Sequence, residues 1–263
     1  MNTNTLSTLL RAALLAACVA VPAFAADTVT PKATPAPKTA RKASDPTVAA
    51  PKANNKRFFE LHESFLKRAK EGPVGLLFLG DSITEGWRKA PEVWNRYYAK
   101  YNVANFGIGG DRTEHILWRI DNGELDGIKP KVVVLMIGTN NTGSNSADQI
   151  AAADRKIVQA LRSKLPESKV LLLAVFPRGP RKGAGGKVDE GDARMKMAKI
   201  DAVNAALAQL DDGKSVRFLN INEKFLADGK IPADIMPDQL HPSAKGYQIW
   251  AEAMQPLLDE MMR

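Results

Sequence analysis

Ser82 and His241 have the surroundings best suited to nucleophilic chemistry in this sequence. Ser82 lies in Gly80-Asp81-Ser82, after an apolar run and before a helical stretch, which predicts a serine on a tight strand-to-helix turn. The N–H groups that open the helix would lie beside the hydroxyl and could stabilise an oxyanion. Asp238 precedes His241 by three residues, so its carboxylate could accept the imidazole N–H and support the imidazolium formed in acyl transfer.

Two further loops carry groups that could donate to the same oxyanion. The run 105–111 (NFGIGGD) is rich in glycine, which lets the backbone approach a ligand closely. A dinucleotide-binding motif would need glycine where Arg112 stands. The other loop contains Asn140, whose side-chain amide could donate at the end of a strand, although Asn-Asn is also common in turns.

Short apolar runs alternate with longer amphipathic segments, which predicts a doubly wound, mostly parallel α/β sheet with helices on both sides. Ligands of such sheets bind beyond the carboxyl ends of the strands, so these ends are expected to hold the site. The predicted strands are Val74–Leu79, Val103–Phe106, Lys131–Ile137, Val170–Phe176 and Val216–Asn220. The predicted helices are Phe58–Lys70, Glu92–Tyr98, Arg112–Ile120, Ala147–Leu165, Ala193–Leu210 and Ala244–Met262.

Taken together and in order, these four loops resemble the SGNH (GDSL) hydrolase superfamily from about Val74 to the last helix. The stretch 105–118 (NFGIGGDRTEHILW) is most similar to the catalytic subunits of intracellular platelet-activating-factor acetylhydrolase and their bacterial relatives. The resemblance implies a three-layer α/β/α, flavodoxin-like fold with a parallel five-stranded sheet. It also implies a serine esterase that needs no cofactor and no metal.

Carried over by position, the resemblance makes Ser82 the nucleophile and His241 the general base and later acid, with Asp238 orienting His241. The oxyanion hole would comprise the backbone N–H groups of Ser82 and Gly110 and the side-chain amide of Asn140. Asp81 is expected to support the turn rather than to react.

The residues next to these groups would contact the acyl and alcohol parts of a bound ester. Ile83, Leu240 and Thr139 would line a small acyl pocket that favours acetyl groups, or Ile83 and Leu240 are ordinary packing residues. Arg178 opens the glycine-rich loop 178–191, which either contacts an acidic substrate or is a plain surface loop. Trp87, beside Gly86, is the aromatic residue of its segment expected to be exposed, where it could stack on a sugar.

The expected activity is hydrolysis of short-chain esters, most simply O-acetyl groups on carbohydrate, so the partner would be a small-molecule or glycan ester. A lipolytic esterase or thioesterase could use the same triad, and acyl-chain preference would separate the two. A catalytically silent glycan-binding protein on this fold is a further alternative. A metal-dependent hydrolase built on Asp81, Asp238 and His241 would need more ligands than the sequence offers.

The first 53 residues are not expected to belong to the catalytic domain, which is predicted over 54–263. Residues 1–26 read as a cleaved signal peptide of a secreted or periplasmic protein, with lipidation at Cys18 as the alternative. Residues 27–53 alternate Pro, Lys, Ala and Thr and are predicted to be a solvated linker. Most of the net charge of +8 lies before residue 58, which argues against nucleic-acid binding by the domain. The apolar run is too short for stable membrane insertion, and the oligomeric state is not predicted.

Overall fold

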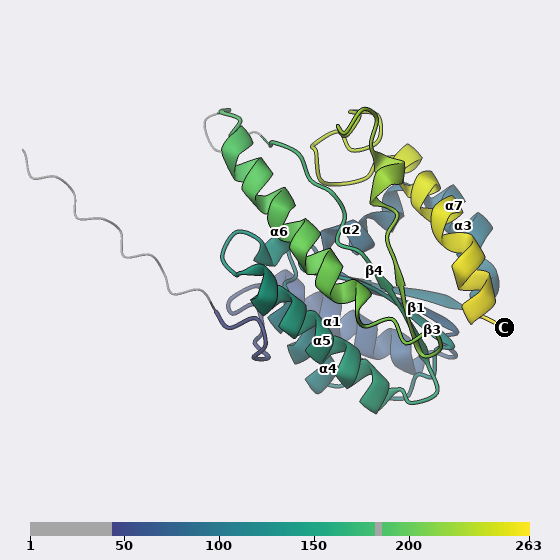
Figure 1. Ribbon diagram of the computed structural model, residues 1–263. Coiled ribbons are helices and arrows are strands. Elements are labelled where there is room, and N and C mark those ends of the chain that lie inside the picture. Colours follow the sequence, from purple (N-terminus) through teal and green to yellow (C-terminus); the bar gives the residue numbers. More distant parts are fainter. Residues whose placement is uncertain (1–43, 182–185) are drawn as a thin grey trace, which may run out of the picture. The chain divides into compact units, whose positions relative to one another are not determined.

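The computed structural model describes residues 44–181 and 186–263, and its centre is a sheet of five parallel strands (Figure 1). The predicted parallel five-stranded α/β fold is confirmed. The strands are ordered β2-β1-β3-β4-β5. Their bounds are β1 Leu76–Gly80, β2 Val103–Gly107, β3 Val132–Met136, β4 Lys169–Leu173 and β5 Val216–Leu219.

Helices cover both faces of the sheet, which gives the three layers (Figure 1). One face packs against α1 Lys56–Lys70, α4 Thr113–Asp121, α5 Ala147–Lys164 and α6 Glu190–Ala208. The other packs against α3 Pro91–Tyr98 and α7 Ala244–Met261. The short helix α2 Ser82–Glu85 follows β1 directly, and the one-turn helix η3 Thr139–Asn141 follows β3.

Alternate residues of the central strands supply the two cores. On β1, Leu77 and Leu79 enter the core beneath α1, α4, α5 and α6, while Leu76 and Phe78 enter the core beneath α3 and α7. This alternation is what a pleated strand covered on both faces requires, and it explains the near-continuous apolar runs in the sequence.

The end of β4 and the start of α6 differ from the predicted bounds because of side-chain hydrogen bonds, which the pattern of apolar residues does not indicate. Strand β4 ends at Leu173, because the Val175 N–H and carbonyl pair with the side-chain amide of Asn204 rather than with a neighbouring strand. Helix α6 begins at Glu190, three residues before the predicted start, because the Asp189 carboxylate caps it by accepting from the Asp192 N–H.

The predicted linker is wrong over its last ten residues, 44–53, which fold onto the domain. Lys52 forms an ion pair with Asp111, and the Ala50 N–H donates to the Glu114 carbonyl. The domain therefore includes residues 44–53. Their composition, with two prolines, three alanines and one lysine, gives no sign of these specific partners. The predicted signal peptide over 1–26, its Cys18, the rest of the linker and residues 182–185 lie outside the described residues.

Candidate active site

The hydroxyl of Ser82, the ring of His241 and the carboxylate of Asp238 lie in one line of hydrogen bonds at the carboxyl end of the sheet. Ser82 Oγ is 2.9 Å from His241 Nε2, and His241 Nδ1 is 2.7 Å from Asp238 Oδ2. Asp238 Oδ1 also accepts from the backbone N–H of His241 at 2.8 Å, which fixes the carboxylate to the loop that carries the ring. A proton can thus pass from the hydroxyl to Nε2 while the carboxylate holds Nδ1–H.

The carboxylate of Asp238 is held in its charged form. Partial burial opposes ionisation, but the hydrogen bonds from the backbone and ring of His241 and the charge of Arg181 keep the pKa of Asp238 below its usual value. Arg181 Nη2 lies 2.7 Å from Asp238 Oδ2, the oxygen that also faces the ring. A charged carboxylate at this position can stabilise an imidazolium when His241 takes up a proton.

The turn that carries Ser82 depends on the two residues before it. A side chain at Gly80 would place its Cβ 2.5 Å from the Met136 carbonyl oxygen, so the close contact of β1 with β3 requires glycine there. Asp81 caps α2 by accepting from the Ile83 N–H at 2.9 Å. Complete burial raises the pKa of Asp81 to about 7, and no atom of Asp81 touches the ring of His241 through a hydrogen bond in the described part of the chain. This position fits the expected supporting role.

Two of the three expected oxyanion donors are backbone N–H groups, those of Ser82 and Gly110. Within 44–181 and 186–263, no protein acceptor takes the backbone N–H of Ser82 or of Gly110, and Gly110 is exposed with a φ of +74° that favours glycine. A Cβ on the neighbouring Gly109 would lie 3.8 Å from the Cβ of Ser82, so the glycine loop lies directly beside the hydroxyl.

The amide of Asn140 is aimed by one strong hydrogen bond. Its Nδ2 donates to the Asp111 carbonyl at 2.8 Å, while its other close acceptor, Asp81 Oδ2, is at 3.4 Å. Because the second contact is long, one N–H of the amide can donate to a ligand oxygen without losing a good internal bond.

The residues expected to bind the acyl group differ in exposure. Ile83 is fully buried and Leu240 is 4% exposed, and both pack in the core beneath α3 and α7, which favours the packing alternative for them. Thr139 is buried and contacts the half-buried Arg178, whose Nη1 lies 3.3 Å from the Thr139 carbonyl. Arg178 thus supports the loop that carries Asn140. Burial and the nearby Arg181 lower the pKa of Arg178.

Trp87 does not offer the exposed ring that the sequence suggested. Its side chain is 1% exposed and packs against Tyr247 and Trp250 with ring centroids 4.6 and 4.9 Å apart. The expectation is wrong because the turn after α2 folds the indole into the core beneath α7.

The remaining histidines have structural partners. His62 Nδ1 lies 3.2 Å from Glu124 Oε2 in the core, and His115 Nδ1 accepts from the Arg112 N–H. Burial lowers the pKa of His115 to about 4. In the described ranges, no group of three or more His, Cys, Asp or Glu side chains is placed to hold a metal ion, and no helix is long and apolar enough to cross a membrane.

Several residues that shape the site were not predicted. Glu85 Oε2 accepts from the Gly109 N–H at 2.7 Å, and Lys52 Nζ donates to the Gly109 carbonyl at 2.7 Å. The fully buried Arg119 bonds to Asp111 and Glu124. Spacing along the chain gives no signal for these contacts, because the partners lie on different elements.

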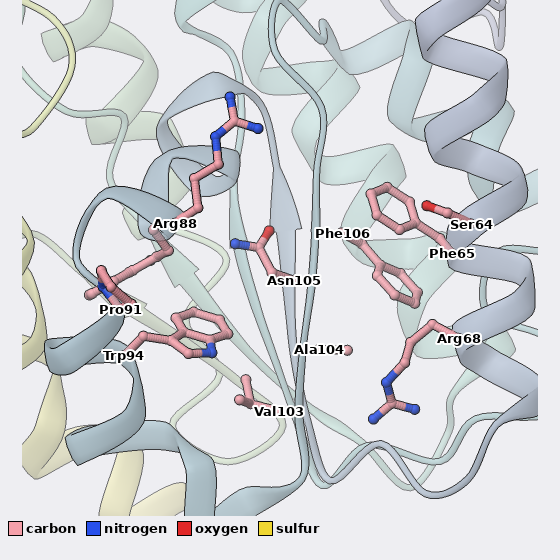
Figure 2. Close-up of a pocket in the computed structure, with 11 residues that line it drawn as sticks. Ser64, Phe65, Arg68, Arg88, Pro91, Trp94, Val103, Ala104, Asn105 and Phe106 are labelled. Carbon is pink, nitrogen blue, oxygen red and sulfur yellow. The ribbon is translucent and has the colours of Figure 1, made fainter.

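None of the triad residues lines the cavities of about 320–700 Å³ in the described part of the chain, two of which border segments considered for substrate binding. One of about 410 Å³ runs along the edge strand β2, with Phe65 and Arg68 of α1 on one side and Trp94 on the other (Figure 2). Its lining includes Trp87, but none of the expected catalytic or acyl-binding residues. The second, of about 590 Å³, is lined by Arg178 and Gln239 together with Arg194, Met197 and Lys230, so it adjoins the loop that carries Asp238 and His241.

Comparisons with known proteins identify the family of the chain and proteins of similar fold. A model of the GDSL-like lipase/acylhydrolase family matches residues 78–249. Platelet-activating factor acetylhydrolase IB subunit alpha1 of Bos taurus is 35% identical over 218 residues, which is 82% of this chain and 88% of that protein. Among solved structures, a GDSL-like lipase from Bacteroides thetaiotaomicron has a TM-score of 0.56 at 19% identity, covering 79% of this chain and 98% of that one. A carbohydrate acetylesterase from Sinorhizobium meliloti has a TM-score of 0.57 at 19% identity, covering 72% and 99%.

Proposed function

Because the chain belongs to the GDSL-like lipase/acylhydrolase family of ester hydrolases, we propose that it cleaves short-chain esters with Ser82 as its nucleophile. The observation that carries the proposal is the continuous chain of contacts from Ser82 Oγ to His241 Nε2, at 2.9 Å, and from His241 Nδ1 to Asp238 Oδ2, at 2.7 Å. No other histidine of the described residues has a serine hydroxyl within hydrogen-bond distance.

The reaction follows from this arrangement. His241 takes the proton of Ser82 as the oxygen attacks the ester carbonyl carbon, and the carbonyl oxygen becomes an oxyanion. The oxyanion receives hydrogen bonds from the N–H groups of Ser82 and Gly110 and from the amide of Asn140. His241 then gives its proton to the departing alkoxide, which leaves an acyl-enzyme. In the second half of the reaction His241 takes a proton from water as the water oxygen attacks the acyl carbon, and His241 then returns that proton to Ser82 as the acid leaves.

We propose acetyl as the preferred acyl group. Ile83 and Leu240, the sequence neighbours of Ser82 and His241, are buried in the core, and neither Ser82 nor His241 lines any of the cavities of about 320–700 Å³ in the described part of the chain, which supports a small acyl group. The relative from Bos taurus is named an acetylhydrolase and the structure from Sinorhizobium meliloti an acetylesterase, and both names support the same preference.

For the alcohol, we propose an O-acetylated carbohydrate, with the cavity lined by Arg178, Gln239, Arg194 and Lys230 as its binding region. The cavity lining has three cationic side chains and one carboxylate, that of Glu190, which lies 3.7 Å from Arg194, and this excess of positive charge would suit a glycan that carries acidic groups. The second candidate is an acetylated phospholipid, which the 35% identity to a platelet-activating factor acetylhydrolase subunit favours. Export of the protein, through a cleaved signal peptide over 1–26, would suit the glycan, and mass spectrometry of the mature N-terminus tests that part.

The deciding experiment measures acetate release by wild type and by Ser82→Ala from acetylated glycans and from an acetylated phospholipid. We expect release from glycans by wild type and a loss of at least about 10³-fold in Ser82→Ala. A p-nitrophenyl ester series should fall from acetate to octanoate. Full activity of a folded Ser82→Ala protein would refute the mechanism, and faster release from the phospholipid would favour the second substrate. A wild-type protein that does not react with a fluorophosphonate would instead support a binding protein without activity.

A further inference from the structure

Lys52, which lies within the segment expected to be a linker, contacts the glycine loop of the proposed oxyanion hole on its carbonyl side. Its Nζ donates to the Gly109 carbonyl oxygen at 2.7 Å and lies 2.7 Å from Asp111 Oδ1. The side chain is only 11% exposed, and a Cβ on Gly110 would lie 3.7 Å from Nζ. The ammonium is therefore packed against the Gly109–Gly110 peptide and held there by a carboxylate.

That carbonyl belongs to the same peptide unit as the Gly110 N–H. In a planar trans peptide the C=O and N–H point in opposite directions, so a donor that fixes the oxygen also fixes the direction of the N–H. Hydrogen bonds from charged donors are roughly twice as strong as neutral ones, and a hydrogen bond at one end of a polar group polarises the other end. An ammonium on the Gly109 oxygen thus makes the Gly110 N–H a better aimed and stronger donor.

We propose that Lys52 is a positioning residue of the esterase, which strengthens the oxyanion hole by orienting and polarising the Gly109–Gly110 peptide. The inference rests on the proposed function, because it needs the Gly110 N–H to bind the oxyanion. Lys52 touches no reacting atom and acts through that peptide.

The peptide lies outside any strand or helix, at the centre of a turn that the Asp111 N–H closes by donating to the Ile108 carbonyl at 3.0 Å. That bond joins the ends of the turn and does not contact the central peptide. Gly110 lies beyond the end of β2 with a φ of +74°, and a pair of glycines can adopt many other conformations. The preceding N–H, that of Gly109, is bound by Glu85 Oε2 at 2.7 Å. Lys52 supplies the matching contact on the carbonyl side, so the loop is held at both ends of Gly109.

The competing explanation is that Lys52 merely attaches residues 44–53 to the domain. Lys156 provides a matched control, because its Nζ donates to the Thr47 carbonyl of the same segment at 2.8 Å and has no contact with the glycine loop among the described residues. Lys52→Gln provides a second comparison, since an amide can still donate to the Gly109 carbonyl but carries no charge.

The experiment measures kcat and KM on p-nitrophenyl acetate, and the rate of inactivation by a fluorophosphonate, for the full chain and its variants. We expect Lys52→Met to lower kcat about 10-fold with KM changed less than about 2-fold, because a donor is weakened and not removed. The inactivation rate should fall in parallel, since the phosphonyl oxygen occupies the same hole. Lys52→Gln should lose less, Lys52→Arg should retain most activity, and Lys156→Met should match wild type.

A folded Lys52→Met protein with wild-type kcat would overturn the inference, and so would an equal loss in Lys156→Met. If Lys52→Met does not fold, Lys52→Gln decides, and wild-type kcat in that variant has the same consequence. Ser82→Ala, assayed alongside, separates the two levels: activity in that variant removes the esterase mechanism itself, whereas its inactivity together with an active Lys52→Met removes only the role of Lys52.

Discussion

Replacement of Asn140 by alanine tests the oxyanion hole most directly. Asn140 Nδ2 is fixed by the Asp111 carbonyl at 2.8 Å and makes only a long contact of 3.4 Å with Asp81, so one of its N–H groups is available to the substrate. Asp111, whose carbonyl loses its donor in this variant, is fully buried, but the Asn140 side chain is itself partly exposed, so water can take the place of the removed amide. The variant should therefore fold with a stability within about 1 kcal/mol of wild type.

The kinetic cost follows from the number of donors. Three groups are proposed to share the oxyanion, and loss of one such donor costs about 10²–10³ in kcat, or about 2.7–4 kcal/mol of transition-state stabilisation. The loss should appear in kcat with little change in KM, because the carbonyl oxygen of the bound ester carries far less charge than the oxyanion.

The assay compares wild type, Asn140→Ala and Asn140→Asp on p-nitrophenyl acetate. Asn140→Asp has nearly the same shape but replaces the donor with an acceptor, so it should be at least as slow as Asn140→Ala. An Asn140→Ala enzyme within about 3-fold of wild type in kcat would show that the amide does not contact the oxyanion.

Three further outcomes concern stability. Arg119→Met should lower the free energy of unfolding in urea by about 3–5 kcal/mol, because it leaves buried Glu124 without its cation and buried Asp111 with Lys52 alone. The half-buried control Arg68→Met, which removes only two long hydrogen bonds to backbone carbonyls, should change it by about 0.5 kcal/mol or less, and equal effects would contradict this. Asp154 is fully buried without a hydrogen-bond partner among the described residues, and burial raises its pKa well above the usual value. Wild type should thus lose stability as pH rises from the ordinary carboxyl pKa to the raised one, and Asp154→Ala should gain in Tm relative to wild type over that interval; a gap in Tm that is constant with pH would refute this. A chain that starts at residue 54 should melt below one that starts at residue 44, because Lys52 and the contacts of residues 44–53 are lost; identical melting curves would show that this segment adds nothing.

The sequence could predict the parts of the site that depend on topology. Parallel strands end at one edge of the sheet, so Ser82 after β1 and Asn140 after β3 had to lie near each other. Asp238 and His241 are three residues apart in one loop, and their contact is local. These relations follow from strand order and short spacing, which an apolar pattern encodes directly.

Contacts that depend on side-chain direction across elements could not be predicted in this way. Whether Ile83 lines a pocket or fills the core depends on how α3 and α7 close over α2, and Trp87 is buried for the same reason. Lys52 lies in a segment whose composition is typical of linkers. Composition alone cannot indicate that one lysine of such a segment forms an ion pair with a buried carboxylate.

Asp111, the last residue of the glycine loop, has contacts that account for an aspartate at this position. Its carboxylate, fully buried, binds Arg119 at 2.6 Å and Lys52 at 2.7 Å, and its own carbonyl orients Asn140 at 2.8 Å. Burial raises the pKa of Asp111, and the two cations oppose that change. Asp111 thus connects residues 44–53, through Lys52, with α4, through Arg119, and with the loop after β3, through Asn140. All three contacts lie next to Gly110. Because all three are tied to the same carboxylate and backbone, a change at any one of them should alter the direction of a proposed oxyanion donor.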